Sequence, residues 1–168
     1  MDLEHLLGQK LLFAFHGKET LSPEIIEAFQ KYHPSGISLF RSLNIGTLAQ
    51  VRELNDSLQR LARDLDLPLL FIATDQEGGQ LMAIGDGTPL PGNMALGATR
   101  SAELARKAGE VLGREMSALG FNVNYAPCAD VNINPQNPVV GVRSFGEDPH
   151  LVAELTAAMI EGMQSQGV

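Results

Sequence analysis

The sequence predicts an α/β fold in which four parallel β-strands are each followed by an α-helix. Four short apolar runs recur along the chain, and each precedes a longer segment whose apolar residues are three or four positions apart. Such spacing is typical of the buried face of a helix. Three of the four runs are almost continuously apolar, as expected for strands that are covered on both faces by crossover helices.

The expected strands are residues 11–15 (LLFAF), 36–40 (GISLF), 68–74 (PLLFIAT) and 121–127 (FNVNYAP). The fourth run differs from the others because Asn122 and Asn124 alternate with apolar residues. Successive side chains of a strand point to opposite faces. One face of the fourth strand is therefore expected to meet polar groups.

The helices have recognisable start and stop signals. Ser22-Pro23 and Asp148-Pro149 each combine an N-cap residue with a proline at the first helical position. Gly120 follows the last apolar residue of another helical pattern, as a terminating glycine should. The expected helices cover approximately residues 22–33, 48–65, 101–120 and 148–167.

Two architectures fit a (βα)₄ pattern, namely an open doubly wound sheet and part of a (β/α)₈ TIM barrel. A complete barrel needs about 250 residues, whereas this sequence has 168 and stops where a fifth strand is expected. We interpret residues 1–168 as one domain that forms half of such a barrel. Four unclosed strands expose sheet edges and apolar faces, so we expect either self-association or a missing C-terminal half.

Composition excludes several classes of function. The net charge of −8 and the pI near 4.9 argue against nucleic-acid binding, and scattered Lys and Arg residues argue against attachment to a membrane surface. There is no apolar stretch of about 18 residues and no signal-peptide pattern at the start. Cys128 is the only cysteine and no histidine pair has metal-ligand spacing. These features predict a cytoplasmic protein without a disulfide, a metal site or a cofactor.

Ligands of both architectures bind at the carboxyl ends of the strands. The loops after the third and fourth expected strands are much longer than the usual two to six or so residues. Asp75 follows the third strand directly, and Gly78-Gly79 allow a sharp turn after it. A carboxylate there can accept hydrogen bonds from two vicinal hydroxyls of a sugar.

Arg143 lies in the proline-rich loop that follows the fourth strand. Its guanidinium can donate several hydrogen bonds to a hydroxyl, an acyl oxygen or a carboxylate. An Arg143 opposite Asp75 would also keep the Asp75 carboxyl ionised. Each of these interpretations has a structural alternative. Residues 74–79 could form an ordinary turn, and Arg143 could serve only to hold its own loop in place. Glu77 is interpreted as a structural partner of a loop, and Met94 as a core residue.

Four segments resemble glycoside hydrolase family 3, most strongly its branch of β-N-acetylhexosaminidases of the peptidoglycan-recycling type. They are DQEGG (75–79), PLPGNMALGAT (89–99), NVNYAPCADVNINPQNPVVGVRSFGEDP (122–149) and GMQSQGV (162–168). The resemblance implies a (β/α)₈ barrel that removes non-reducing terminal β-linked sugars with retention of configuration. It also implies that Asp75 and Arg143 contact the terminal sugar, and it predicts a β-linked saccharide that contains N-acetylglucosamine, such as a peptidoglycan fragment.

The sequence departs from the family pattern in two respects. Gln80 and Ala83 stand where this branch usually carries basic residues. The family's lysine–histidine pair, its acid/base pair and its aspartate nucleophile would all lie beyond Val168. The resemblance thus assigns no catalytic residue to this chain, which we expect to bind a sugar without cleaving it.

Three alternatives remain open at this point. The first is a β-glucosidase or xylosidase of the same family, and the second is a non-catalytic sugar-binding half-barrel that pairs with another chain. The third is an unrelated doubly wound domain, which predicts a sheet whose strand order reverses.

Overall fold

The computed structural model describes residues 3–168, which form two compact units. The first unit comprises the chain up to Thr74 together with Ala118–Val123, and the second comprises Asp75–Ser117 together with Asn124–Val168. Each unit has its own buried apolar core. The sequence-based prediction of one domain over residues 1–168 stays a prediction.

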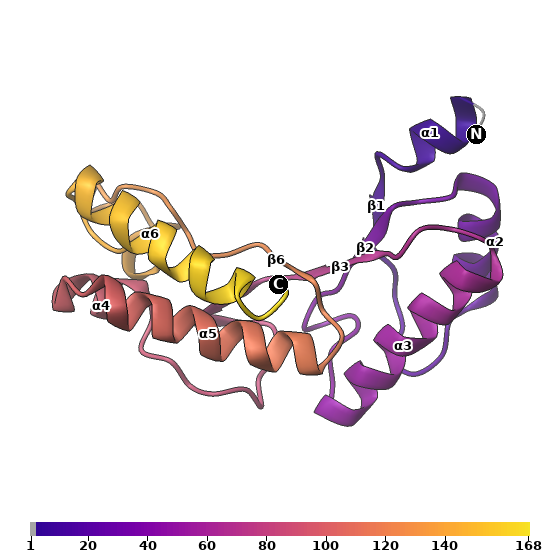
Figure 1. The fold of residues 1–168 in the computed structure, drawn as a ribbon, viewed down its shortest axis with the longest axis horizontal. Helices are drawn as coiled ribbons and strands as arrows, with labels where there is room; N and C mark the ends of the chain where they lie inside the picture. The colour runs from indigo at the N-terminus through magenta and orange to yellow at the C-terminus, as the bar shows by residue number, and fades with distance from the viewer. Residues whose placement is uncertain (1–2) are drawn as a thin grey trace. The chain divides into compact units, whose positions relative to one another are not determined.

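The first unit alternates short strands and helices along the chain (Figure 1). Strand β1 pairs in parallel with β2, and β2 pairs in parallel with β3. The strand order is β1-β2-β3-β6, which follows the order of the chain without a reversal. This order excludes the doubly wound alternative and agrees with a barrel-type (βα)₄ sheet. The elements are α1 (Leu3–Gly8), β1 (Leu12–Phe13), α2 (Pro23–Tyr32), β2 (Gly36–Ser38), α3 (Leu48–Asp64), β3 (Phe71–Thr74) and β6 (Val123–Asn124).

The register gives the sheet of the first unit one covered and one open face. Ile37 aligns with Ile72, and both are fully buried. The neighbouring row contains Leu12, Gly36 and Phe71, aligned across the three strands. Leu12 is 42% exposed and Phe71 is 53% exposed, so this row is an uncovered apolar face of the sheet.

The side chains of Asn122 and Asn124, in the fourth apolar run, form hydrogen bonds with main-chain groups. Asn122 accepts a hydrogen bond from the Ile72 amide (2.7 Å) and donates one to the Leu70 carbonyl (2.8 Å). Asn124 makes the same pair of contacts with the amide and the carbonyl of Gln76, both at 2.9 Å. The polar groups that the sequence predicted for one face of this run are therefore peptide groups.

The second unit has a hairpin and three helices. Strands β4 (Gln76–Gly78) and β5 (Leu81–Met82) pair antiparallel. Helices α4 (Asn93–Thr99), α5 (Ala102–Ala118) and α6 (Pro149–Gln164) follow, with a 3₁₀ turn η1 (Gly141–Arg143) before α6 (Figure 1). Helices α5 and α6 approach closely, since a Cβ on Gly109 would lie 2.2 Å from the Met159 carbonyl oxygen. Their core contains Leu96, Ala105, Ala108, Leu112, Phe145, Val152, Leu155, Ala158, Met159 and Met163.

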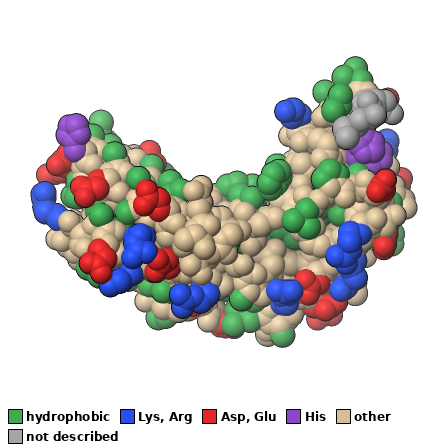
Figure 2. Space-filling view, viewed as in Figure 1, with side chains coloured by type: hydrophobic (Ala, Val, Ile, Leu, Met, Phe, Trp, Pro, Cys, Tyr) green, Lys and Arg blue, Asp and Glu red, His purple; other side chains and the backbone are tan. Residues whose placement is uncertain are grey.

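The structure confirms all four predicted helices and their boundaries to within a few residues. Asp148 caps α6 by accepting a hydrogen bond from the His150 amide (2.9 Å), and His33 ends α2 in a left-handed conformation. None of the helices in residues 3–168 could cross a membrane. Figure 2 shows Lys and Arg side chains interspersed with Asp and Glu, without a continuous basic stripe on the visible face.

Candidate functional site

The β4–β5 hairpin fixes the two carboxylates of the DQEGG segment. Asp75 follows β3 directly, and its carbonyl accepts a hydrogen bond from the Ala83 amide (3.1 Å). Gly78 and Gly79 have φ angles of 80° and 61°, in the left-handed region that favours glycine. They make the sharp turn that the sequence predicted. Glu77 lies on β4 and is only 4% exposed.

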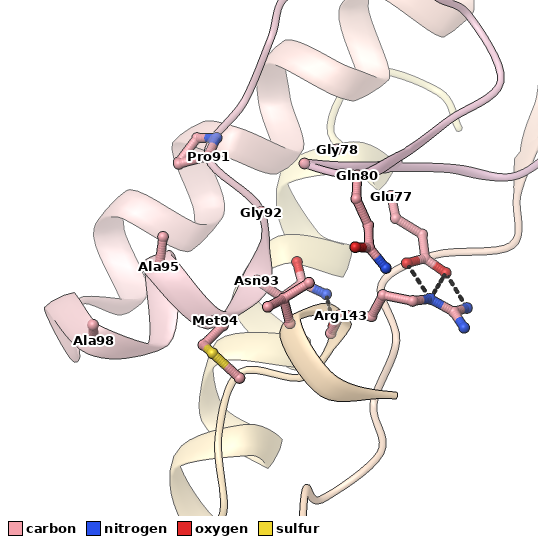
Figure 3. Close-up of a pocket in the computed structure, with 12 residues that line it drawn as sticks. Glu77, Gly78, Gln80, Pro91, Gly92, Asn93, Met94, Ala95, Ala98 and Arg143 are labelled. Carbon is pink, nitrogen blue, oxygen red and sulfur yellow. Dashed lines mark hydrogen bonds and ion pairs between the residues drawn. The ribbon is translucent and has the colours of Figure 1, made fainter. Parts of the chain in front are cut away.

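Arg143 forms an ion pair with Glu77 (Figure 3). Its Nε donates to both carboxylate oxygens of Glu77, at 2.9 and 3.2 Å, and its Nη2 donates to Oε1 at 2.5 Å. Its Nη1 donates to the Val139 carbonyl at 3.3 Å. The interpretation of Glu77 as a loop partner is confirmed. The hydrogen bonds of the guanidinium run to Glu77, whereas the sequence had placed Arg143 opposite Asp75.

Three effects act on the pKa of the Asp75 carboxyl. Burial raises the pKa of the Asp75 carboxyl above its usual value, the nearby Glu77 charge raises it further, and Arg143 lowers it. The attraction by Arg143 thus has the expected sign but is outweighed by the other two effects. The expectation that Arg143 keeps Asp75 ionised stays a prediction. Glu77 in turn raises the pKa of Arg143 above its usual range, so the guanidinium stays charged.

The loop that carries Arg143 is anchored at this residue and at the two residues after it. Ser144 is fully buried, and its hydroxyl donates to the Asp130 carbonyl (2.6 Å). Phe145 is 2% exposed and belongs to the core of the second unit. Asn93, the first residue of α4, donates its amide to the Arg143 carbonyl (2.7 Å). Helix α4 and the buried Ser-Phe pair therefore hold the loop, in addition to its prolines.

A cavity of about 340 Å³ lies beside the ion pair. Glycine, proline and small apolar residues form most of its wall, and its polar side chains are Glu77, Gln80, Asn93 and Arg143 (Figure 3). Met94 lies in this wall and is 37% exposed, so the prediction that it is a core residue is wrong. Asp75 is not among the twelve lining residues, which are Glu77, Gly78, Gly79, Gln80, Pro91, Gly92, Asn93, Met94, Ala95, Ala98, Val142 and Arg143.

The only cysteine is not activated. The Cys128 thiol donates to the Asp130 carboxylate (3.2 Å), and burial raises the pKa of the thiol. A raised pKa leaves less thiolate, which is the nucleophilic form. In the described part of the chain, no three His, Cys, Asp or Glu residues are grouped so that they could hold a metal ion.

The sequence model of the glycosyl hydrolase family 3 N-terminal domain matches residues 5–168. The chain belongs to glycosyl hydrolase family 3. Among curated relatives, β-hexosaminidase A of Pseudoalteromonas piscicida is 38% identical over 189 residues, covering all of this chain and 31% of the relative. A β-hexosaminidase of Nitrosomonas eutropha is 38% identical over 148 residues, covering 83% of this chain and 41% of the relative.

Solved structures of family 3 proteins agree with this assignment. A glycoside hydrolase family 3 β-N-acetylglucosaminidase from Paenibacillus sp. FPU-7 matches the whole chain, with a TM-score of 0.95 and 43% identity, over 32% of its own length. Native NagZ from Neisseria gonorrhoeae matches 93% of the chain, with a TM-score of 0.79 and 30% identity, over 46% of its own length. The chain thus spans about a third to a half of these family 3 relatives, at 31% to 46% of their length.

The two residues that the family resemblance assigned to sugar binding lie in the same unit. Their contact with a sugar stays a prediction. Ala83 is 7% exposed, so position 83 leaves little room for a long basic side chain. Gln80 lines the cavity, and Arg143 is the only cation among its twelve lining residues. Asn93, which donates to the Arg143 carbonyl, was not among the predicted site residues, although it lies in the PLPGNMALGAT segment that resembles the family.

Proposed function

We propose that this chain is the sugar-binding part of a family 3 β-N-acetylhexosaminidase. In this proposal Asp75 and Arg143 hold a non-reducing terminal N-acetylglucosamine, and the enzyme that contains the chain hydrolyses the β-linkage of that sugar with retention of configuration. The proposal is supported by the relatives named β-hexosaminidase and by structures of β-N-acetylglucosaminidases that match the whole chain.

The observation that carries the proposal is the orientation of Arg143. The contacts to Glu77 and Val139 use Nε–H, one N–H of Nη2 and one N–H of Nη1. A guanidinium has further donors, so one N–H on each terminal nitrogen remains for a ligand. In this proposal the two free N–H donors of the Arg143 guanidinium bind hydroxyl and acyl oxygens of an N-acetylated sugar. The Asp75 carboxyl accepts hydrogen bonds from hydroxyls of the same sugar.

Cleavage is assigned to residues other than these. A retaining glycosidase needs a nucleophilic carboxylate and an acid/base group on either side of the scissile bond. Glu77 is bound to Arg143, and Asp75 in this proposal accepts hydrogen bonds from the sugar. We therefore expect residues 1–168 alone to bind N-acetylglucosamine without hydrolysing a β-N-acetylglucosaminide.

Titration calorimetry tests the binding. We expect N-acetylglucosamine to bind the chain with a dissociation constant on the order of millimolar or lower, and we expect Asp75→Ala to abolish the heat of binding. Asp86→Ala, at an exposed position of the same unit, is the matched control and should bind like the wild type. Binding heat that survives in Asp75→Ala would contradict the proposal.

A β-glucosidase of the same family is the second candidate. A β-N-acetylglucosaminidase/β-glucosidase of Cellulomonas fimi is 39% identical over 99 residues, covering 59% of this chain and 18% of the relative. Gln80 and Ala83 in place of basic residues also favour this candidate. In the natural protein that contains these residues, the rates of p-nitrophenol release from the N-acetylglucosaminide and from the glucoside decide between the two.

Two finer features belong to the same proposal. The family branch indicates a peptidoglycan fragment as the saccharide, which release of N-acetylglucosamine from purified muropeptides would test. The uncovered row of Leu12 and Phe71 indicates that the isolated chain associates with itself through this face.

A further inference from the structure

Glu77 is the only charged side chain that is buried among residues 3–168. Removing a carboxylate from water is costly unless a partner and hydrogen bonds compensate for the lost hydration. Arg143 provides both, through three hydrogen bonds between 2.5 and 3.2 Å. Because the buried Glu77 carboxylate makes all three of these hydrogen bonds with Arg143, it fixes the position of the Arg143 guanidinium.

The contacts divide the guanidinium into a bound edge and a free edge. Nε and Nη2 face Glu77 (Figure 3). Nη1 donates to the Val139 carbonyl. The main chain of Arg143 is held separately, because the Asn93 side-chain amide donates a hydrogen bond to the Arg143 carbonyl. Both ends of Arg143 are therefore fixed, and its remaining N–H groups have one orientation.

The ion pair is not needed to anchor the loop. Ser144 and Phe145, the two residues after Arg143, are already buried and bound to the second unit. Removing the Glu77 charge would leave these anchors in place and release only the guanidinium. The Glu77–Arg143 ion pair therefore acts on the position of the guanidinium and not on the position of the loop.

We propose that Glu77 is the positioning residue of this site, which holds the Arg143 guanidinium so that its free N–H groups stay directed to the bound sugar. The inference rests on the proposed function, because it names the residue through which Arg143 is made ready to bind. Glu77 itself does not contact the sugar in this proposal. An arginine fixed before binding loses less side-chain entropy when the ligand arrives.

Glu77 also affects the pKa of the neighbouring Asp75 carboxyl, after burial. The charged groups that act on Asp75 are Glu77, which raises its pKa, and Arg143, which lowers it. In Glu77→Gln the repulsion disappears and the attraction by Arg143 remains. The pKa of Asp75 should therefore be lower in this variant than in the wild type.

Three variants test the inference. Glu77→Gln removes the charge and keeps the size of the side chain, and Glu77→Asp keeps the charge but is too short to hold the same geometry. Glu103→Gln is the matched control, because Glu103 pairs with Lys107 at an exposed position of the same unit. The measurements are the dissociation constant for N-acetylglucosamine, the NMR signal of the Arg143 Nε–H, and the titration of the Asp75 carboxyl carbon.

We expect Glu77→Gln to weaken N-acetylglucosamine binding about tenfold, to broaden or lose the slowly exchanging Arg143 Nε–H signal, and to shift the Asp75 titration to lower pH. Glu77→Asp should keep the Asp75 titration near that of the wild type but weaken binding by a smaller factor. Glu103→Gln should match the wild type in all three measurements.

Wild-type affinity in Glu77→Gln, with the Nε–H signal retained, would overturn the inference and leave the proposed function intact. Absence of sugar binding in the wild-type chain would overturn the proposed function and this inference with it. If Glu77→Gln does not fold, Glu77→Asp decides, since unchanged affinity and an unchanged Nε–H signal in that variant contradict positioning by a two-oxygen contact.

Discussion

The main chain of Gly97 lies directly against the carbonyl group of Phe145. A Cβ at position 97 would be 1.7 Å from the Phe145 carbonyl oxygen, which is far inside van der Waals contact. Gly97 is on α4 and Phe145 follows Arg143 by two residues. The helix after the diglycine hairpin and the arginine loop can approach this closely only because one of them lacks a side chain.

Gly97→Ala should therefore destabilise the second unit. Alanine is favoured over glycine inside a helix by about 1 kcal/mol, but the overlap with a main-chain oxygen forces α4 and the loop apart. We expect a net loss of about 3 kcal/mol in the free energy of unfolding, measured by denaturant titration. Ala98→Ser, at the next and exposed position of α4, should change it by less than about 0.5 kcal/mol. A Gly97→Ala variant of wild-type stability would contradict the close contact.

Asn93→Ala removes the hydrogen bond between α4 and the Arg143 carbonyl. Asn93 is 2% exposed, and its Nδ2 donates to that carbonyl at 2.7 Å. Leaving the carbonyl unpaired should lower the free energy of unfolding by about 1–2 kcal/mol. Thermal unfolding followed by circular dichroism would measure the loss, with Gln164→Ala at an exposed position of α6 as the control. Equal losses in the two variants would show that the Asn93 contact is not formed.

Asp75→Asn should stabilise the protein near neutral pH. The pKa of Asp75 is raised in the folded state by burial and by Glu77, so its ionisation at pH 7 opposes folding. The native state binds the proton more strongly than the unfolded state does. The unfolding free energy of the wild type therefore falls as pH rises through the range just above the usual pKa of 3.8.

Asparagine cannot ionise and lacks this cost. We expect a higher melting temperature for Asp75→Asn than for the wild type at pH 7, and a smaller difference as the pH is lowered toward 3.8. Asp86→Asn controls for the loss of one negative charge at an exposed position. A melting-temperature difference of the opposite sign at pH 7 would show that the environment favours the ionised carboxyl.

The open sheet face predicts concentration-dependent association. Leu69 is 73% exposed and Phe71 is 53% exposed, on the segment that enters and forms β3. The double variant Leu69→Lys and Phe71→Lys should sediment as a smaller species than the wild type at the same concentration. Leu104→Lys, which changes a 44% exposed residue of α5, should leave the sedimentation coefficient unchanged. A wild-type chain that sediments as a monomer at every concentration would reject association through this face.

The regular elements could be predicted from the sequence because their signals are local. Pro23 at the start of α2 and Asp148 before α6 act within a few residues of their position, and the structure has both as predicted. Helix α4 was missed because its seven residues are too short to show a helical period. The β4–β5 hairpin was missed because its strands have two or three residues and contain glutamine, glutamate and glycine.

The sequence indicates charged candidates for the site but not how they pair. Motif and loop position identified Asp75 and Arg143 as candidates, yet the partner of Arg143 is decided by geometry between segments 66 residues apart. Asp75 and Glu77 are separated by one residue, so no sequence pattern distinguishes which carboxylate the guanidinium reaches. The difference comes from burial, since Glu77 lies on a strand at 4% exposure and therefore needs the counter-charge most.

The contact between α4 and the arginine loop also bears on the construction of chimeras. A designer who transplants residues 126–148 from one family 3 protein into another would transfer the arginine but not the glycine-containing helix on which its backbone rests. The two stretches therefore form one module for grafting, although they are far apart in the primary structure. Crossover points chosen between α4 and the arginine loop should yield hybrids with misplaced arginines, and points that keep both from the same parent should yield functional ones.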